Sequence, residues 1–389
     1  MYKIMKLNKI AAGGLAAFPL DKYELGTEIA QPDAILLRSY DMKEMDLPES
    51  LLAVGRAGAG VNNIPISKCS EKGIVVFNTP GANANAVKEL VIAGLMLASR
   101  NIAGGISFLQ TLKGKGSEVP DLIEKNKKDF AGQEILGKTL AIIGLGKIGV
   151  MVANSAIDLG MEVIGYDPFI SVNSAWGLSR EVQRAEGFDT LLGKADYISL
   201  HTPLTDDTRG MLNAEKFSRM KKKVRILNFS RGGIVNNDDL KKAIEQGIVE
   251  RYVTDFPDDE LLHMDKVINI PHLGASTQEA EDNCATMIAK QIRDFIEHGR
   301  IKNSVNYPDC ELELNSAFRL LVMNRNIPNM VGQISSILAE ENINIVEMLN
   351  KSKGDYACNL IDISSEPSEK IIKSLYGIKG VLKVRSLCL

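Results

Sequence analysis

The stretch Leu140-Ala-Ile-Ile-Gly-Leu-Gly-Lys-Ile-Gly149 starts as a short apolar run and ends in glycines spaced Gly-x-Gly-x-x-Gly. The apolar run is typical of a buried strand, and the apolar residues 150–153 continue it as a helix. Gly144 permits the tight turn, Gly146 lets backbone approach a pyrophosphate, and Gly149 lets the helix pack close to the strand. The stretch therefore predicts a strand, turn and helix whose N–H groups bind a dinucleotide.

A second strand, Val163-Ile-Gly-Tyr-Asp-Pro168, follows the helix and ends in an acid, Asp167. Its carboxylate would accept hydrogen bonds from an adenosine ribose, whereas a 2′-phosphate would meet a like charge. The pair of strands therefore predicts NAD as the cofactor in preference to NADP. A bare Gly-x-Gly-x-x-Gly is often only a glycine-rich turn, and the flanking strand, helix and acid are what make this one specific.

Bulk composition narrows the function classes. The chain has 389 residues, of which 45% are hydrophobic and 24% charged, as expected for two or three globular domains. A net charge of -3 gives no reason to expect binding to nucleic acid or to a membrane surface. The five cysteines are scattered without a Cys-x-x-Cys pair, which fits a reducing cytoplasm. The four histidines are not spaced as metal ligands, so no metal is expected.

Residues 138 to about 281 repeat a strand and then a helix, the pattern of a doubly wound parallel sheet. Ligands bind at the carboxyl ends of such strands. The polar residues at these predicted ends are Asp167, His201, Asn228, Asp255 and His272. We therefore expect them to gather at one edge of the sheet.

Strands and helices also alternate through the first 95 residues, with strands at 34–38, 52–55 and 74–77 and a helix at 86–100. Residues 101–137 are polar and are expected to cross the surface. A long amphipathic helix is predicted at 278–298, and a linker with Pro308 follows it.

The C-terminal residues form a distinct unit. Strands are predicted at 318–323, 343–349, 356–363 and 381–385, and helices at 328–341 and 367–376. The order β-α-β-β-α-β is that of a small ferredoxin-like sandwich.

A hydride-transfer enzyme acting on a 2-hydroxy acid needs a base, an orienting carboxylate and a cation. His272, in a loop punctuated by proline and glycine, is the best base, and an imidazole titrates near neutrality (pKa roughly 6.5). Glu260 could hydrogen-bond its other ring nitrogen, although Asp258 and Asp259 compete for that role. Arg231, flanked by glycines, can grip a carboxylate with two hydrogen bonds.

Each residue also has a plainer interpretation. A lone loop histidine is more often a surface group, and an arginine beside two glycines is commonly part of a turn. His201 is either a wall of the nicotinamide pocket or a satisfied loop histidine. The case for catalysis rests on the co-location of His272 and Arg231 at successive strand ends.

These residues lie in longer motifs that cover nearly the whole chain: Gly55-Arg-Ala-Gly-Ala-Gly-Val-Asn62, Asn78-Thr-Pro-Gly-Ala-Asn83, 137–149, His201-Thr-Pro-Leu-Thr205, Ser230-Arg-Gly-Gly233 and Pro271-His-Leu-Gly-Ala-Ser-Thr277. With them the chain resembles the D-isomer-specific 2-hydroxyacid dehydrogenases, and most closely the D-3-phosphoglycerate dehydrogenases of that family. The resemblance implies NAD-dependent oxidation of 3-phosphoglycerate, the first step of L-serine biosynthesis. Alternatives are another member of the family, such as a hydroxypyruvate or glyoxylate reductase, and a scaffold that senses NAD without turnover.

The resemblance also assigns residues. It puts Arg231, Glu260 and His272 at the catalytic positions. The NAD-contacting positions that it assigns are Thr79, Lys147, Ile148, Asp167, Thr202, Ser230 and Asp255. The other expected cofactor-binding residues are the turn glycines Gly144, Gly146 and Gly149, the strand-end His201, and Gly274. The substrate-binding positions are Arg56, Asn83 and Arg231, and Arg38 joins them because a phosphate needs more than one cation. The other interpretation of Arg38 is a surface salt bridge.

The family fold implies a Rossmann-type NAD domain at 98–282, inserted into a flavodoxin-like substrate domain made of 1–97 and 283–310. It also implies a homodimer or homotetramer. The ferredoxin-like unit, 317–389, resembles an ACT domain, a module that binds amino acids at a paired interface and that glycerate and lactate relatives generally lack.

The ACT loop departs from the family pattern His-x-Asn-x-Pro-Gly, because this chain has Asn324-Arg-Asn-Ile-Pro-Asn329. Asn326 and Asn344 match positions that hold an L-serine effector. Asn324 cannot carry the charge of the histidine it replaces. Asn329 tolerates the left-handed backbone of the usual glycine, so the turn is expected to survive.

Overall fold

The computed structural model of the chain describes residues 1–388. These divide into two compact units, one made of residues 1–83 with 278–388 and the other of Ala84–Thr277. The unit Ala84–Thr277 interrupts the other in sequence, as expected for an inserted domain. The precise three-domain boundaries stay a prediction.

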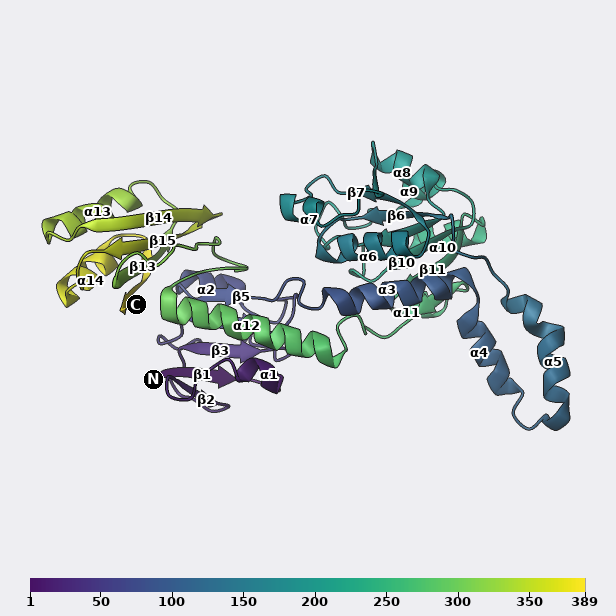
Figure 1. Cartoon of the computed structure of the whole chain (residues 1–389), viewed down its shortest axis with the longest axis horizontal. Coiled ribbons are helices and arrows are strands. Elements are labelled where there is room, and N and C mark those ends of the chain that lie inside the picture. Colours follow the sequence, from purple (N-terminus) through teal and green to yellow (C-terminus); the bar gives the residue numbers. More distant parts are fainter. Residues whose placement is uncertain (389) are drawn as a thin grey trace. The chain divides into compact units, whose positions relative to one another are not determined.

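The inserted unit is built on a seven-stranded parallel sheet in the order β12-β11-β10-β9-β6-β7-β8. Strands β6, β7, β10 and β11 of this sheet are labelled in Figure 1. The strands are β6 (Thr139–Ile143), β7 (Glu162–Tyr166), β8 (Gln183–Arg184), β9 (Tyr197–Leu200), β10 (Val224–Asn228), β11 (Val249–Thr254) and β12 (Val267–Asn269). The helices are α3 (Ala84–Ser99), α4 (Ile102–Thr111), α5 (Val119–Asn126), α6 (Lys147–Asp158), α7 (Val172–Trp176), α8 (Phe188–Lys194), α9 (Ala214–Ser218), α10 (Asn237–Glu245) and α11 (Asp259–Leu262). The predicted Rossmann-type fold is confirmed.

The strand order indicates at which edge of the sheet a ligand would bind. β6 pairs with β7 on one side and with β9 on the other, so the chain reverses its direction of growth across the sheet at β6. In doubly wound sheets, ligands bind beyond the carboxyl ends of the strands at this switch point. All five residues of β6 are buried, because its two faces lie under helices.

The segment 101–137 differs from the expected polar crossing. It folds into α4, α5 and two short 3-10 helices, Gly116–Glu118 and Lys127–Phe130. Neither α4 nor α5 has a buried residue, and Phe108 of α4 packs against the ring of Phe130. Helices whose apolar residues are not buried in a core have a less distinct hydrophobic pattern in the sequence.

The other unit contains a parallel five-stranded sheet in the order β2-β1-β3-β4-β5, which is the flavodoxin-like order that the sequence predicted. Its strands are β1 (Tyr2–Lys6), β2 (Tyr23–Gly26), β3 (Ala34–Leu37), β4 (Ala53–Arg56) and β5 (Val75–Phe77), with helices α1 (Ala12–Leu15), α2 (Ile66–Glu71) and α12 (Gln278–His298). Helix α12 packs so closely that a Cβ on Gly14 would lie 2.3 Å from the carbonyl carbon of Ala285.

The same unit carries a four-stranded sheet in the order β14-β15-β13-β16, with antiparallel pairing throughout. Its elements are β13 (Phe318–Arg325), α13 (Met330–Glu340), β14 (Ile345–Lys353), β15 (Tyr356–Ile363), α14 (Glu369–Gly377) and β16 (Val381–Cys388). This is the predicted β-α-β-β-α-β order. Helices α13 and α14 pack on one face of the sheet through Leu320 and Val322. Leu321 and Met323, on the other face, join the core around α12.

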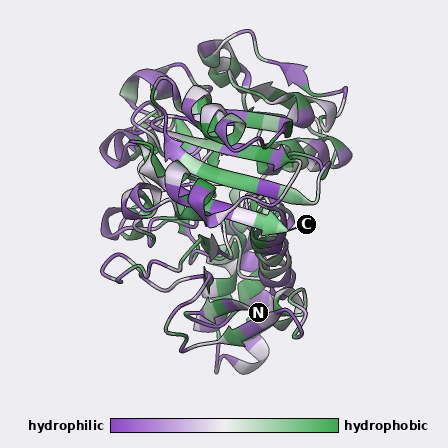
Figure 2. Cartoon of the chain, turned by 90° about the vertical axis from the view of Figure 1, so that its left-hand side faces the viewer, coloured by the Kyte–Doolittle hydropathy of each residue, from purple (hydrophilic) through white to green (hydrophobic). Residues whose placement is uncertain are grey.

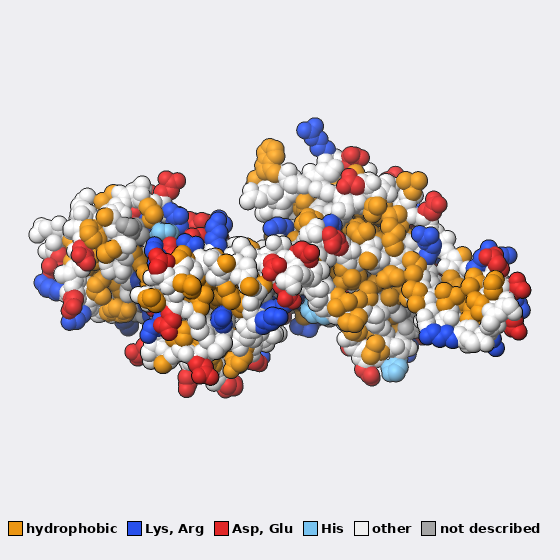
Figure 3. All heavy atoms as spheres, turned by 60° about the horizontal axis from the view of Figure 1, so that its bottom comes forward, with side chains coloured by type: hydrophobic (Ala, Val, Ile, Leu, Met, Phe, Trp, Pro, Cys, Tyr) orange, Lys and Arg blue, Asp and Glu red, His pale blue; other side chains and the backbone are white. Residues whose placement is uncertain are grey.

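Hydrophobic residues concentrate in the strands and in the inner faces of the helices, and hydrophilic residues in the loops (Figure 2). Charges of both signs are interspersed on the face shown in Figure 3. All five cysteines lie within residues 1–388 and are free thiols. Within the same residues no single helix is long and apolar enough to cross a membrane, although α3 and α4, bent by 69°, pass that test as a pair.

Candidate functional site

The glycine turn after β6 has the geometry that its sequence predicts. Gly144 has φ +94°, and a Cβ there would lie 2.6 Å from the carbonyl oxygen of His201. A Cβ on Gly149 would lie 2.0 Å from the carbonyl oxygen of Gly144, so helix and turn meet without room for a methyl group. Around Gly146, by contrast, no atom lies within 4 Å of the Cβ position. The turn therefore leaves open space at Gly146, where a pyrophosphate can approach the protein backbone.

Asp167 is tied to that turn. Its Oδ2 accepts a hydrogen bond from the backbone N–H of Leu145 at 2.8 Å, and its Oδ1 accepts one from Phe169 at 2.8 Å. These bonds fix the carboxylate beside the glycine loop at the end of β7. A fixed negative charge there suits a ribose with free hydroxyls and opposes a phosphate.

His201 lies across the turn from Asp167, at the end of β9. Its ring Nε2 lies 2.8 Å from the hydroxyl of Ser199, and its backbone N–H donates to Ile143 at 2.7 Å. Burial lowers the pKa of the imidazole to about 4, so the ring is neutral near pH 7. A neutral imidazole bonded to a serine can line a nicotinamide pocket without adding charge.

Three polar atoms at this edge are buried without a partner among residues 1–388. They are the Oγ1 of Thr202, the Oδ1 of Asp255 and the Oδ1 of Asn269. An unpaired buried oxygen costs free energy unless a ligand or water satisfies it. Together with the open space at Gly146 and the start of α6, where Lys147 is exposed and Ile148 half-buried, they fit a dinucleotide whose polar groups bind at this edge.

The loop after β10 presents Arg231. Buried Asn228 shapes this loop, since its amide donates to the carbonyl of Arg231 at 2.9 Å and to the hydroxyl of Tyr252 at 3.0 Å. Its Oδ1 accepts from the backbone N–H and the hydroxyl of Ser230. The Arg231 guanidinium is exposed, and its Nη1 donates a hydrogen bond to the carbonyl of Ser230 at 2.6 Å. Its other donors point to no protein acceptor among residues 1–388, so they can meet a substrate carboxylate.

Phe256 brings Arg231 and His272 together. The Phe256 ring lies 4.5 Å from the His272 ring, centroid to centroid, and 5.9 Å from the Arg231 guanidinium carbon. His272 is exposed in its loop. The predicted base and the predicted cation thus flank one aromatic ring at the carboxyl ends of β10 and β12.

Asp255, at the end of β11, supports the same loop. Its Oδ2 accepts a hydrogen bond from the backbone N–H of Gly274 at 3.3 Å. Burial raises the pKa of Asp255, and the charges of His272 and Arg231 oppose that rise. The three charged residues therefore influence one another within a single cluster.

Glu260 lies on α11 and has a different partner from the one expected. Its Oε2 accepts a hydrogen bond from the side-chain amide of Asn237 at 3.1 Å. No hydrogen bond joins Glu260 to His272 among residues 1–388. Glu260 lines a hollow of about 330 Å³ together with Arg209, Gly233 and Asp258. Asp259, which competed for the orienting role, instead pairs with His263 at 3.7 Å on the exposed surface.

The predicted phosphate cations lie in the other unit. Arg38, just after β3, forms an ion pair with Glu281 of α12, as the salt-bridge interpretation expected. Arg56 ends β4, and its Nε donates to Oδ1 of Asn63 at 3.1 Å. The amide of Asn63 donates in turn to the carbonyls of Arg38 and Tyr40. Asn63 therefore connects the loops that carry both arginines.

Two further predicted residues belong to this unit. Thr79 is fully buried, its backbone N–H donates to Gly58 at 3.1 Å, and its Oγ1 has no partner among residues 1–388. Asn83 is half-buried and ends the first segment of the unit.

The predicted effector residues lie at the end of the four-stranded sheet. The amide of Asn326 donates to the carbonyl of Gly354 at 3.0 Å, and Asn344 is exposed next to β14. Asn324 is buried and accepts from the amide of Asn359 at 2.7 Å, so it takes part in the sheet. Asn329 has φ +66°, which confirms the predicted left-handed turn.

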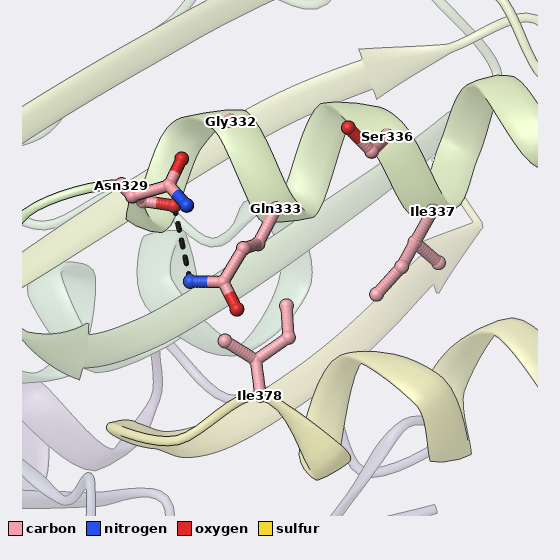
Figure 4. Close-up of a pocket in the computed structure, with 6 residues that line it drawn as sticks. All are labelled: Asn329, Gly332, Gln333, Ser336, Ile337 and Ile378. Carbon is pink, nitrogen blue, oxygen red and sulfur yellow. Dashed lines mark hydrogen bonds between the residues drawn. The ribbon is translucent and has the colours of Figure 1, made fainter.

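A hollow of about 340 Å³ lies beside that turn (Figure 4). In it the amide of Gln333 donates to the carbonyl of Asn329 at 3.1 Å, and Ile337 and Ile378 form the apolar wall. Asn326 and Asn344 do not line it.

Comparison with known proteins assigns part of the chain to a family. Residues 92–274 match the family model described as D-isomer specific 2-hydroxyacid dehydrogenase, NAD binding domain. These residues are an NAD-binding domain of the D-isomer-specific 2-hydroxyacid dehydrogenases. The assignment confirms the predicted NAD cofactor.

Members of the 2-hydroxyacid dehydrogenase family are similar over most of the chain. The D-3-phosphoglycerate dehydrogenase of Methanocaldococcus jannaschii is 34% identical over 339 residues, which cover 85% of this chain and 62% of that protein. The human D-3-phosphoglycerate dehydrogenase is 36% identical over 298 residues, covering 74% of this chain and 53% of that protein. The chain thus spans between about half and two thirds of the length of these relatives.

A solved structure is also similar to this chain. The NAD+-bound 3-phosphoglycerate dehydrogenase of Entamoeba histolytica is 26% identical, with a TM-score of 0.61 over 78% of this chain and 98% of that one.

The sequence analysis did not identify Phe256 and Asn237, which contact the candidate catalytic residues. Phe256 directly follows a predicted strand-end acid, which is the one signal that could have drawn attention to it.

Proposed function

We propose that this chain oxidises the C2 hydroxyl of 3-phospho-D-glycerate with NAD+, giving 3-phosphohydroxypyruvate, the first step of L-serine biosynthesis. The observation that carries the proposal is the cluster in which Phe256 contacts both His272 and the guanidinium of Arg231. The similarity to D-3-phosphoglycerate dehydrogenases over 85% of the chain supports the choice of substrate.

The chemistry follows from the residue types. His272 takes the proton of the C2 hydroxyl, since its imidazole is exposed at the ligand edge and can act as a general base. Arg231 binds the substrate carboxylate through its free donors and orients C2. Glu260 stabilises the imidazolium that forms when His272 is protonated. The turn at Gly144, Gly146 and Gly149 and the Asp167 carboxylate would hold NAD+, which would supply the acceptor for the hydride of C2.

The phosphate of the substrate would need further cations, and we propose Arg38 and Arg56 for this role. Asn83 of the same unit is proposed as a further polar contact of the substrate. The fixed position of Arg56 against Asn63 supports this role. We also propose that the protein forms a homodimer or homotetramer and works in the cytoplasm, where its five free thiols would stay reduced. L-serine is the proposed effector, at Asn326 and Asn344.

The test is the loss of NADH absorbance with 3-phosphohydroxypyruvate, hydroxypyruvate and glyoxylate in parallel. We expect kcat/KM for 3-phosphohydroxypyruvate to be at least about 100-fold higher than for hydroxypyruvate or glyoxylate. The reason is that each of the two additional cation contacts to the phosphate contributes more than about one kcal/mol. Turnover of the unphosphorylated acids alone would assign the chain to another branch of the family.

The catalytic role of His272 has its own test. His272→Gln is expected to lower kcat by about 10² to 10⁴-fold, the usual contribution of a general acid or base. His263→Gln is the matched control, because His263 lies on the exposed surface and pairs only with Asp259. Equal loss in both variants would remove His272 from the mechanism.

A further inference from the structure

The amide nitrogen of Asn237 joins two carboxylates. It donates one hydrogen bond to Oδ2 of Asp258 at 2.8 Å and another to Oε2 of Glu260 at 3.1 Å. An amide carries two N–H donors, so each carboxylate receives its own proton. The neutral amide group of Asn237 thus bonds to two negatively charged carboxylates at once.

The groups that meet at this nitrogen are fixed by the fold. Asn237 is the first residue of α10, whose terminus is capped by Asn236 accepting from Asp239 at 3.0 Å. Asp258 caps α11 through Leu261, whose side chain is 3% exposed. Two capped helix starts therefore set the position of the amide.

The bond uses only one oxygen of Glu260. Within residues 1–388, Oε1 of Glu260 has no hydrogen bond, while Oε2 is anchored to Asn237. An anchored carboxylate with one free oxygen can accept from an imidazole N–H with little loss of side-chain entropy. The anchor is also neutral. A lysine in its place would pair with Glu260 and weaken its effect on a neighbouring imidazolium.

We propose that Asn237 is a positioning residue, which holds Oε2 of Glu260 so that Oε1 serves His272. This inference rests on the proposed function, since it gives His272 and Glu260 their proposed roles. Asp258 shares the amide and keeps it from turning away. Asn237 itself touches neither substrate nor cofactor in this assignment.

The experiment compares wild type with Asn237→Leu, which is close in size and has no donor. In the reducing direction, protonated His272 is the active form, and a held carboxylate stabilises it. Asn237→Leu is therefore expected to lower kcat about 10-fold and to move the alkaline limb of kcat/KM about one pH unit lower, with KM little changed. Asn237→Gln, which keeps an amide, is expected to recover part of the loss.

Asn213→Leu is the matched control. Asn213 begins α9 and accepts from Lys216 at 3.2 Å, so its loss affects a helix cap far from Glu260 in sequence. It is expected to change thermal stability without moving the pH profile. Glu260→Gln combined with Asn237→Leu should be no worse than Glu260→Gln alone, because both act through one carboxylate.

A second readout does not need turnover. The protonation midpoint of His272, followed by NMR with saturating NADH, is expected to fall in Asn237→Leu and in Glu260→Gln alike. If wild type reduces no 2-oxo acid but this midpoint falls, the proposed function fails and the positioning role stands. An active Asn237→Leu whose pH profile and His272 midpoint match wild type overturns the positioning role and leaves the proposed function intact.

Discussion

The guanidinium of Arg319 donates to both carboxylate oxygens of Asp362, at 2.6 and 2.9 Å, and neither side chain is exposed to solvent. The remaining Arg319 donors reach the carbonyls of His298, Leu312 and Glu313. One buried cation thus ties the end of α12 and the following linker to the strands β13 and β15.

Removing this cation should strongly destabilise the unit that contains it. Arg319→Met leaves the buried Asp362 carboxylate without its cation, with only the backbone N–H of Asn315 as a donor, and it removes one donor from each of three carbonyls. We expect a loss of about 3 to 5 kcal/mol in the free energy of unfolding, measured by urea denaturation. Lys370→Met is the control, since Lys370 pairs with Glu341 on the exposed surface and its removal should change nothing measurable. Similar midpoints for the two variants would contradict this account.

Substitutions at two glycines of the nucleotide turn should have different effects, one on stability and the other on cofactor binding. Gly149→Ala places a methyl group 2.0 Å from the Gly144 carbonyl, so the turn must shift and the protein should lose thermal stability. Gly146→Ala meets no protein atom within 4 Å, so stability should hold while the methyl group blocks the pyrophosphate. Differential scanning calorimetry and NADH fluorescence titration measure the two effects. Stable Gly149→Ala, or Gly146→Ala with wild-type NADH affinity, would show that the turn does not work in this way.

Local patterns were enough to predict most elements of the fold. Helix α12 has the predicted bounds 278–298, and β15 has the predicted bounds 356–363, because strong periodicity fills each from end to end. The helices of 101–137 were missed, since their apolar residues Ile102, Ile106 and Leu109 remain partly exposed and form no buried stripe. Strand β8 has only two residues, which is too short to show a period.

The site was harder to predict than the fold. Motifs identified Arg231 and His272 because each follows a strand at the ligand edge. The contact of Asn237 with Glu260 joins residues 23 positions apart, and no pattern along the chain encodes it. The pairing of Arg38 with Glu281 spans still more of the sequence and depends on how α12 packs against the first sheet.

Asp167 should set the choice of cofactor. Its carboxylate is held next to the glycine turn by the backbone of Leu145 and Phe169. Asp167→Asn removes the charge while keeping an acceptor, so NADH affinity should fall about 10-fold and the preference over NADPH should narrow. Glu162→Gln, on the same strand β7, is the control and should leave both affinities unchanged. Fluorescence titrations with both cofactors measure the ratio, and an unchanged ratio in Asp167→Asn would remove Asp167 from cofactor selection.

His201 should make the protein less stable in acid. Burial lowers the pKa of its folded state to about 4, whereas an unfolded histidine titrates near 6.5. Between these values the unfolded chain binds the extra proton, so the free energy of unfolding falls as the pH drops from about 6.5 towards 4. The loss should be smaller than the roughly 1.4 kcal/mol per pH unit of a fully sequestered group, because His201 keeps some exposure. His201→Gln keeps a donor for Ser199 and cannot titrate. The difference in urea stability between wild type and this variant should therefore shrink on going from pH 7 to pH 5. A difference that stays constant would mean that His201 takes up its proton as readily in the folded state as in the unfolded chain.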